Sequence, residues 1–403
     1  MKVVVVGAGP AGAATALLLA RAGVDVTLVE RETSFDRVFR GEALMPSGVD
    51  ALHEMGLGSA LDQLGARRLE GWEIFIDGEP IFRVPEPIAE LGERAVRIVP
   101  QPALLERMVA EARREPAFHL LTGAGVRDLL HADGRVRGVS VLGASGAQEL
   151  EADLVIACDG RASTVRARAG LELVRSPEHY DVLWFKMPAP DELRERCSFM
   201  MFASATTQAA CYTSWDGRLQ FALVLRKGAY RERRGAAWLD ELVRPLPRWL
   251  ADHVQAVRGD VEGPVVLDVI VGRCRRWSAP GVLAIGDAAH PMAPIRAQGI
   301  NVALRDAIVT ANHVVAAARA GWGAERLAAA TEAVQREREP EIARAQTLQH
   351  RDARGWNSRF APLLLGVAKR LGKRIGGRAW AQRAWLEQQR DLRFGIGPVK
   401  LAR

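Results

Sequence analysis

Three glycines at the start of the chain have the spacing that phosphate binding requires, in the segment GAGPAG at residues 7–12. Gly7 permits a tight turn, Gly9 lets backbone N–H groups approach a pyrophosphate, and Gly12 lets a helix pack closely on a strand. The N-terminus of that helix would face the negative charge. Glu30 follows about 20 residues later, where a carboxylate accepts hydrogen bonds from ribose hydroxyls. The pattern predicts an adenine-dinucleotide site, without separating FAD from NAD.

A second candidate site lies in the segment DLVIACDGRASTVR, residues 153–166, at the end of a buried strand. Asp159 ends the strand, and Ser163 and Arg166 follow it. These polar residues suit contact with a bound dinucleotide. They equally suit a strand-to-helix turn in which Asp or Ser caps the helix. The residues alone leave both interpretations open.

A third candidate site is the segment GDAAHPMAPIRAQGINVALRDA, residues 286–307. Asp287 ends a strand, where a carboxylate can accept hydrogen bonds from a polyol such as ribitol. A helix that begins near Gly299 would direct its N-terminal dipole at an anionic edge, such as the N1–C2=O region of a reduced flavin. A nicotinamide enzyme needs no such element, so this segment favours FAD.

Arg296 is an unexpected long cation among the small residues of this third segment. One interpretation places it in solvent or paired with Glu42 or Asp306. The other places it against the substrate or NAD(P)H side of a flavin, which makes it a candidate catalytic residue. His290 looks catalytic, but the setting favours a structural hydrogen-bonding role.

The elements that must position these residues follow from hydrophobic patterning. A buried strand, a small-residue helix and a second strand predict a βαβ unit. Between about 175 and 275, short alternating segments predict an antiparallel sheet with a turn at WDG. We therefore expect an α/β fold with a Rossmann-like domain, an inserted antiparallel sheet and a helical C-terminus. Expected strands are 2–6, 24–30, 135–142, 153–157 and 281–287; expected helices are 10–22, 97–114 after Pro100, 299–319 and 324–350.

The length of 403 residues predicts two associated domains or one composite domain. Four scattered cysteines, with no Cys-x-x-Cys pair, argue against a metal site or a disulfide framework and favour a reducing cytoplasm. The early glycines and the strand after them argue against a secretory signal. Since no run of 18 apolar residues occurs, we expect no membrane span.

The net charge of +7 is concentrated at the C-terminal end of the chain. From Arg344 onward there are 14 Lys and Arg against 3 Asp and Glu, so the rest of the chain carries −4. As a helix, residues 361–389 would be amphipathic and basic, which suits peripheral contact with an anionic membrane surface. The alternative is a C-terminal helical cap whose cations lie in water. Nucleic acid is not expected, because no recognition motif accompanies the charge.

Taken in this order and spacing, the three motifs resemble the single-component (class A) FAD-dependent aromatic hydroxylases, the group of para-hydroxybenzoate hydroxylase. The resemblance covers roughly residues 1–360. It implies an FAD-binding domain formed by 1–75, 97–174 and 276–345, and a β-rich substrate domain formed by 76–96 and 175–275. A basic helical region, 346–403, follows.

The resemblance also implies roles for individual residues. The ADP half of FAD would be held by Gly7, Gly9, Gly12, Glu30 and Arg31. The pyrophosphate and flavin would face Arg40, in VFRGEALMPSG, and FAD would also contact Gln101; both FAD and NAD(P)H would contact Asp159 and Arg166. Ribitol would bind to Asp287, and the isoalloxazine ring would be lined by Pro294 and the backbone of 297–301, including Gly299, Ile300 and Asn301.

The chemistry implied by the resemblance comes from flavin. NADPH or NADH reduces FAD, O2 adds at flavin C4a, and the hydroperoxide transfers OH to an electron-rich aromatic or quinone-like ring. We therefore expect a monooxygenase of biosynthetic or tailoring metabolism. FAD-dependent halogenases and prenyl-chain olefin reductases, which resemble the same scaffold, are the alternatives.

The inserted strands carry candidate substrate contacts. Tyr212 and Trp215 suit a pocket wall, although alternating spacing also makes them ordinary sheet residues. Few cations occur in these strands, so we expect a mostly apolar pocket and a lipophilic substrate. Lys186 and Arg226 would overturn that expectation if they pointed inward.

Overall fold

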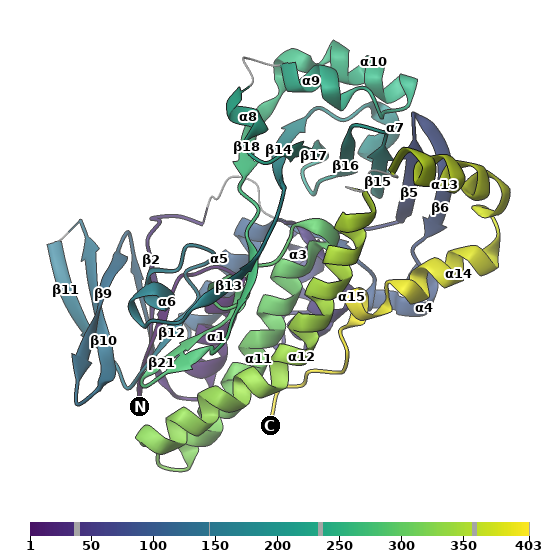
Figure 1. Ribbon diagram of the computed structural model, residues 1–403. Coiled ribbons are helices and arrows are strands. Elements are labelled where there is room, and N and C mark those ends of the chain that lie inside the picture. Colours follow the sequence, from purple (N-terminus) through teal and green to yellow (C-terminus); the bar gives the residue numbers. More distant parts are fainter. Residues whose placement is uncertain (36–40, 145, 233–236, 357–360, 403) are drawn as a thin grey trace.

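Two large sheets organise the molecule, as the ribbon in Figure 1 shows. The computed structural model describes residues 1–35, 41–144, 146–232, 237–356 and 361–402. Within these ranges, a mostly parallel sheet packs against long helices, and a mixed sheet stands at one end of it.

The parallel sheet carries the N-terminal strand. Its Val-rich central strands are almost wholly buried, as expected for a parallel sheet covered on both faces. Among the strands that the structure describes in this sheet, only the edge strand β20 runs antiparallel to its neighbour. Because the carboxyl ends of parallel strands meet at one edge, this sheet gathers the residues that follow β1, β2, β12 and β21. The order is β20 (Ser278–Ala279), β21 (Val282–Ala284), β12 (Leu154–Ala157), β1 (Lys2–Val6), β2 (Asp25–Glu30) and β8 (Phe118–Thr122).

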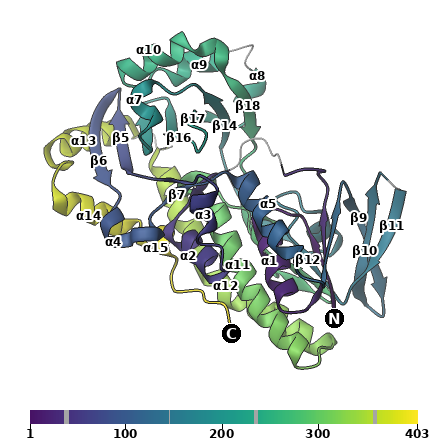
Figure 2. The ribbon, with the colours of Figure 1, turned by 180° about the vertical axis from the view of Figure 1, so that it is seen from behind.

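Long helices pack beside this sheet. The small residues of α1 (Pro10–Arg21) let it pack closely against both α5 (Gln101–Ala112) and α11 (Gln298–Arg319). α12 (Ala324–Trp356) lies alongside α11 in both ribbon views (Figures 1 and 2). Gly286 lies between the two helices, because a Cβ there would lie 3.1 Å from Cβ of Ala11 in α1 and 3.8 Å from Cβ of Ala303 in α11.

The mixed sheet has seven strands in the described chain. Side chains alternate between its faces. One face packs against α9 and α10, where Trp238 contacts Phe185. The opposite face carries Trp72 and Tyr212 in a cluster that also includes Ala297, so it is turned toward the third motif. The order is β18 (Glu262–Leu267), β14 (Tyr180–Met187), β17 (Leu219–Arg226), β16 (Gln208–Thr213), β15 (Ser198–Ala203), β5 (Gly71–Ile76) and β6 (Glu79–Pro85); the covering helices are α8 (Ala229–Glu232), α9 (Ala237–Leu242) and α10 (Arg248–Ala256).

Smaller elements connect the two sheets. The small sheet formed by β3, β7 and β4 joins the loop after residue 41 to the segment that begins α5. The strands of this small sheet are β3 (Ala43–Leu44), β4 (Arg67–Arg68) and β7 (Arg97–Ile98). Two further sheets stand apart from it: β9 (Gly125–Ala132), β10 (Arg135–Gly143) and β11 (Gly146–Glu151) form one, and β13 (Leu173–Ser176) and β19 (Val271–Cys274) form the other. The remaining short helices are α2 (Pro46–Glu54), α3 (Ala60–Gln63), α4 (Ile88–Leu91), α6 (Thr164–Arg168) and α7 (Asp191–Arg194).

The C-terminal region forms three helices, α13 (Ala361–Ile375), α14 (Ala379–Gln388) and α15 (Arg390–Phe394). The continuous helix considered for 361–389 is interrupted between α13 and α14, where two glycines follow Ile375. Both α13 and α14 pack on β6, and α15 packs on α2 (Figure 2). In the described residues no helix is long and apolar enough to cross a membrane.

The expected fold class is confirmed: a Rossmann-like α/β unit, an inserted sheet with mainly antiparallel pairing and a helical C-terminus. One domain boundary needs correction. β5 pairs in parallel with β15 from Gly71 onward, so the inserted sheet begins before residue 76. The remaining domain limits stay a proposal.

Candidate active site

The glycine-rich turn has the geometry that a dinucleotide needs. Gly7 has φ +96°, and a Cβ there would lie 2.6 Å from the carbonyl oxygen of Cys158. A Cβ on Gly12 would lie 1.8 Å from the carbonyl oxygen of Gly7. A Cβ on Gly9 would meet no atom within 4 Å. Two glycines therefore serve close packing, whereas the third faces open space that a pyrophosphate can fill.

Glu30 ends β2 beside this turn and is buried. Its carboxylate accepts hydrogen bonds from the backbone N–H of Ala8 at 2.7 Å and of Glu32 at 3.0 Å. The carboxylate is thus held at the strand end where ribose hydroxyls are expected. Arg31 is exposed and pairs with Glu32 at 3.0 Å. Its proposed contact with the ADP half remains a prediction.

The second motif is a capped turn. The side chain of Asp159 accepts hydrogen bonds from the hydroxyl of Ser163 and from the backbone N–H of Thr164 at 2.7 Å and Val165 at 3.1 Å. Burial raises the pKa of the Asp159 carboxyl, and these hydrogen bonds oppose the rise. The capping alternative therefore describes Asp159 in this structure, and its role toward FAD or NAD(P)H stays a prediction.

Arg166 connects the second motif to the third. This buried guanidinium donates to the carbonyl oxygens of Ala288 and Arg161, each at 3.0 Å. Ala288 directly follows Asp287, the expected ribitol ligand, which is half-buried in a single 3-10 turn. Arg166 thus positions the loop that carries Asp287.

The third motif turns sharply before α11. Arg296 has φ +64° and Ala297 φ +51°, two consecutive left-handed residues, and α11 begins at Gln298. Pro294 is half-buried at the start of the turn, and Ile300 is buried in the first turn of the helix. A Cβ on Gly299 would meet no atom within 4 Å. The helix N-terminus therefore borders open space, as a flavin edge requires.

Asn301 holds this turn against the loop that follows residue 41. Its Oδ1 accepts from the backbone N–H of Met45 at 2.8 Å, and its Nδ2 donates to the carbonyl oxygens of Ala43 and Ala297 at 3.2 and 2.5 Å. Gln101 anchors the same loop, because its Nε2 donates to the carbonyl oxygen of Gly41 at 3.2 Å. Arg40, one residue earlier, lies outside the described residues.

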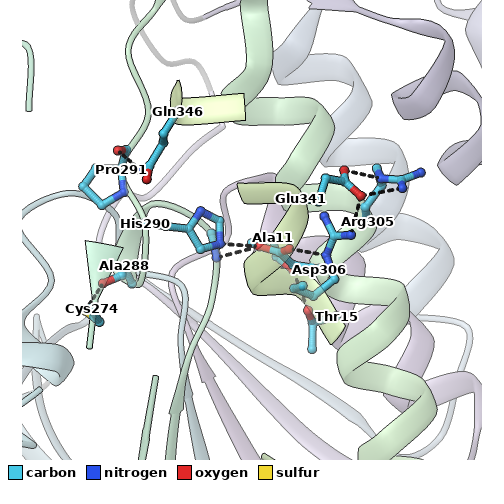
Figure 3. Close-up of polar contacts among 12 residues, drawn as sticks. Ala11, Thr15, Cys274, Ala288, His290, Pro291, Arg305, Asp306, Glu341 and Gln346 are labelled. Carbon is cyan, nitrogen blue, oxygen red and sulfur yellow. Dashed lines mark hydrogen bonds and ion pairs between the residues drawn. The ribbon is translucent and has the colours of Figure 1, made fainter. Parts of the chain in front are cut away.

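His290 is fully buried in a polar network, drawn in Figure 3. Its Nε2 lies 2.8 Å from Oδ2 of Asp306, and Arg338 donates to Oδ1 of Asp306 at 2.8 Å. Glu341 then joins Arg338 to Arg305. Burial alone would raise the pKa of Asp306, but His290 and Arg338 outweigh it and the net pKa is lowered. This geometry supports the structural interpretation of His290.

Arg296 borders a narrow cavity between the third motif and the mixed sheet. The cavity is lined by Met45, Trp72, Arg296 and C-terminal residues that include Trp385. The guanidinium carbon of Arg296 lies 5.6 Å from the ring centroid of Trp385. The carboxylates expected as its partners bind other cations: Glu42 contacts Lys186, and Asp306 contacts Arg338. The helix α14 was not expected at this site.

The wall of the mixed sheet is partly aromatic. Phe199 stacks against Tyr212 with 5.7 Å between the ring centroids, and its ring centroid lies 5.3 Å from that of Trp72. The ring centroids of Trp72 and Trp385 lie 5.7 Å apart. Tyr212, a candidate catalytic residue, is buried in this wall. The rings form a continuous aromatic layer, and Trp72 and Trp385 of this layer line the cavity beside Arg296, where they suit an aromatic ligand.

The expected apolar character of the pocket needs correction at one end of this wall. Lys186 points inward, is buried, and contacts Glu42, Ser214 and Asp216. Arg226, the other cation considered, is exposed. The sequence indicated Lys186 as a cation that could point into the pocket, but it did not indicate Ser214 and Asp216. Nothing in the residues around the WDG turn shows that this turn folds over Glu42.

The three motifs converge at one edge of the parallel sheet. Gly7 touches the end of β12, a Cβ on Gly286 would lie 3.1 Å from Cβ of Ala11, and Arg166 holds Ala288. Around this edge, Gly9 and Gly299 face open space and Glu30 presents a carboxylate. The described residues thus fit an extended dinucleotide whose flavin end would lie near the aromatic wall.

This fold and site define a class A FAD-dependent monooxygenase of the aromatic hydroxylase type. A family model described as FAD binding domain matches residues 1–346. The chain belongs to that family.

Individual relatives support the same class. The chain is 35% identical over 355 residues to 6-methylpretetramide 4-monooxygenase from Streptomyces rimosus, covering 86% of this chain and 82% of that protein. It is 27% identical to squalene epoxidase 1 from Arabidopsis thaliana over 77% of this chain, but spans only 58% of that protein. The structure of p-nitrophenol 4-monooxygenase PnpA from Pseudomonas putida DLL-E4 superposes with a TM-score of 0.81 over 98% of both chains, and at 21% identity it shows the fold.

Proposed function

We propose that this protein uses NADPH or NADH and O2 to hydroxylate an aromatic or quinone-like ring in a biosynthetic or tailoring pathway. The observation that carries this function is the aromatic wall of Trp72, Phe199 and Tyr212 opposite the loop of Arg296 and Ala297. A flat ring bound there would lie between the sheet and the expected flavin face. The similarity to 6-methylpretetramide 4-monooxygenase supports an aromatic substrate.

The chain's own residues would bind and position the reactants. Gly7, Gly9 and the N-terminus of α1 would hold the pyrophosphate, and Glu30 the adenosine ribose. Asp287 would hold ribitol, with Arg166 fixing its loop through Ala288. Bound FAD would supply oxygen activation at its C4a atom. The buried aromatic wall would exclude water from the reacting ring.

The polar end of the wall refines the substrate class. Lys186, Glu42 and Ser214 are buried at the end of the wall that carries Tyr212, so this end offers a ligand polar neighbours where the rest of the wall is aromatic. A lipophilic ring system that carries at least one hydroxyl or carbonyl group suits both parts of the pocket.

The test is a screen of the purified, FAD-loaded protein with NADH and NADPH against phenols, quinolones and quinones. We expect one substrate class to stimulate nucleotide oxidation and to yield one hydroxylated product per nucleotide consumed. Halide-dependent chlorination or bromination would identify a halogenase, and saturation of a prenyl chain would identify an olefin reductase. Either product, or protein that does not bind FAD, would contradict the proposed function.

Peripheral membrane contact is a second proposal, favoured by one surface of α13. Leu363, Val367 and Leu371 recur every four residues and are 68%, 55% and 53% exposed. Arg370 and Arg374 are exposed beside them, whereas Lys369 and Lys373 face Glu79 of the protein body. Such a stripe suits an anionic bilayer, where each basic residue near the surface contributes on the order of 1 kcal/mol.

Sedimentation with phosphatidylserine-containing vesicles tests this contact. The wild-type protein should sediment with these vesicles, and much less with phosphatidylcholine alone. Val367→Asp with Leu371→Asp should abolish sedimentation, whereas Trp322→Asp, at an exposed apolar residue elsewhere, should not. Wild-type protein that stays in the supernatant would rule the contact out.

A further inference from the structure

A buried ion pair between Arg393 and Glu86 joins the C-terminal region to the mixed sheet. Arg393 lies on α15, Glu86 directly follows β6, and their side chains are 4% and 0% exposed. Arg393 Nη2 donates to Glu86 Oε1, and Trp72 Nε1 donates to Glu86 Oε2 at 3.2 Å. The backbone N–H of Val96 also donates to this carboxylate. Glu86 therefore accepts three hydrogen bonds within the protein and is firmly held.

The guanidinium of Arg393, by contrast, keeps donors that the ion pair does not use. Its Nε and Nη1 are both buried, and neither has a hydrogen-bond partner in the part of the chain that the structure describes. Phe394 packs nearby, with 5.7 Å from its ring centroid to Cζ of Arg393, and supplies no oxygen acceptor. A buried donor without an acceptor costs about 1–3 kcal/mol, and more in a charged group. These donors therefore indicate an acceptor that comes from a ligand.

Such an acceptor has a place to enter, because Arg393 lines the narrow cavity beside Arg296. The cavity volume is about 10 Å³, which corresponds to about one water-sized group. Its other lining residues are Met45, Trp72, Trp385, Gln389 and Leu392. The cavity thus matches a single substituent of a ring, and the ring that carries this substituent lies outside it, along the aromatic wall.

The charges around the cavity select the chemistry of that substituent. Among the described residues that line it, two are arginines and none is acidic. In a space shielded from water, two cations favour a group with full or partial negative charge and disfavour an amine. The planar N–H groups of a guanidinium suit oxygen acceptors such as a carboxylate, a carbonyl or a phenolate. The fitting ligand is therefore an oxygen substituent rich in electron density.

We propose that Arg393 is a specificity-determining residue that binds a carboxylate, carbonyl or phenolate oxygen of the ring substrate. The oxygen accepts a hydrogen bond from Nε or Nη1 of Arg393, while Nη2 stays paired with Glu86. Because Glu86 also accepts from Trp72, the oxygen-binding group is joined to the aromatic wall through two hydrogen bonds. The matched family model ends at residue 346, so this contact is supplied by a part of the chain outside it.

This role deepens the proposed function and rests on it, so the test measures ligand binding without turnover. The FAD-loaded protein is titrated by calorimetry with 2-naphthoate and with naphthalene-2-methanol, two probes with the same rings and a charged or a neutral oxygen substituent. Arg393→Met is combined with Glu86→Gln, so that no unpaired carboxylate is left buried. Arg393→Lys keeps the charge beside Glu86. Arg390→Met is the matched control, since Arg390 lies on the same helix, is 66% exposed and pairs loosely with Glu387.

Wild-type protein and Arg390→Met should bind 2-naphthoate at least about tenfold more tightly than naphthalene-2-methanol, as a charged hydrogen bond implies. The double variant should bind both probes within about threefold of each other, and so should Arg393→Lys, because its compact ammonium is drawn to Glu86 and offers no planar donors. Affinity for naphthalene-2-methanol and for FAD should stay at the wild-type level, which a merely structural loss would lower.

Two outcomes would overturn this role of Arg393 while leaving the proposed function intact. One is wild-type protein that binds the two probes equally well. The other is a double variant or Arg393→Lys that binds FAD and keeps the full preference for 2-naphthoate. Wild-type protein that binds neither FAD nor any ring probe would overturn the proposed function as well.

Discussion

Arg166 donates from Nη1 to the carbonyl oxygen of Ala288 at 3.0 Å and thereby joins two motifs that lie 122 residues apart in the chain. Its Nη2 holds the carbonyl oxygen of Arg161 at the same distance. The loop that carries Asp287 is therefore positioned by a residue of the second motif. The second and third motifs are thus joined beside Asp287, the residue proposed to bind ribitol.

Arg166→Ala should weaken FAD binding by about tenfold or more, because a charged hydrogen bond contributes roughly 1.5–3 kcal/mol. Arg168→Ala is the control, since Arg168 lies on the same helix, is 56% exposed and pairs only loosely with Asp128. Fluorescence titration of the apoprotein with FAD measures both. Equal affinities in the two variants would show that Arg166 does not position the loop.

Gly9→Ala and Gly12→Ala should fail in different ways. A Cβ on Gly9 enters the open space expected for pyrophosphate, so the variant should fold normally and lose FAD affinity. A Cβ on Gly12 collides with the carbonyl oxygen of Gly7, so that variant should lose at least about 1–3 kcal/mol of unfolding free energy. Urea unfolding of the apoproteins and FAD titration separate the two effects. A Gly9→Ala variant that binds FAD as wild type does would contradict the assignment.

Asp306→Asn should destabilise the protein by about 3–5 kcal/mol at pH 7, because it leaves Arg338 buried without its carboxylate. Since the folded-state pKa of Asp306 is lowered, its contribution is present above the unfolded pKa of about 3.9 and is lost as pH falls through the folded pKa. The stability difference between wild type and variant should therefore shrink in acid below about pH 4.

Urea unfolding across pH 3–7 measures this difference. Asp252→Asn is the control, since Asp252 forms an exposed pair with Arg248 and should change stability by less than about 1 kcal/mol. A difference between wild type and Asp306→Asn that does not depend on pH would contradict the stated role of the carboxylate.

Arg296→Gly should leave the free energy of unfolding within about 1 kcal/mol of wild type. Glycine relieves the left-handed backbone at φ +64°, while the contact with Trp385 is lost. If Arg296 acts on the flavin or substrate side, the fraction of NAD(P)H that yields hydroxylated product should fall, and Arg296→Lys should restore part of it. Unchanged flavin reduction and product yield in Arg296→Gly would assign Arg296 to a structural role.

The local elements of the fold were predictable from the sequence. β1, α1 and β2 follow from a valine run, a small-residue helix and a second strand within thirty residues. α11 begins and ends within one residue of the expected limits, whereas α12 begins at the expected residue and continues to Trp356, beyond the expected end at 350. Their signals are short-range hydrophobic periods and glycine breaks. The convergence of Gly7, Asp159 and Asp287 was predictable for the same reason, because each follows a parallel strand.

Long-range relationships were not predictable in this way. The parallel pairing of β5 with β15 joins residues 127 apart, and Glu42 meets Ser214 across 172 residues. The contact of Trp385 with Trp72 depends on where the chain turns after α13. No local pattern specifies these pairings, because they depend on the packing of whole elements. The polar end of the pocket and the C-terminal contribution therefore emerged only from the structure.

The most direct test of the central claim is the origin of the oxygen atom in the product. The FAD-loaded protein is incubated with NADH or NADPH and the best ring substrate from the screen under ¹⁸O2, and the product is weighed by mass spectrometry. A flavin monooxygenase should place one ¹⁸O atom on the ring, with the other reduced to water. Product that carries oxygen only from H2¹⁸O in the converse experiment, or nucleotide oxidation that yields only hydrogen peroxide with every ring tested, would contradict it.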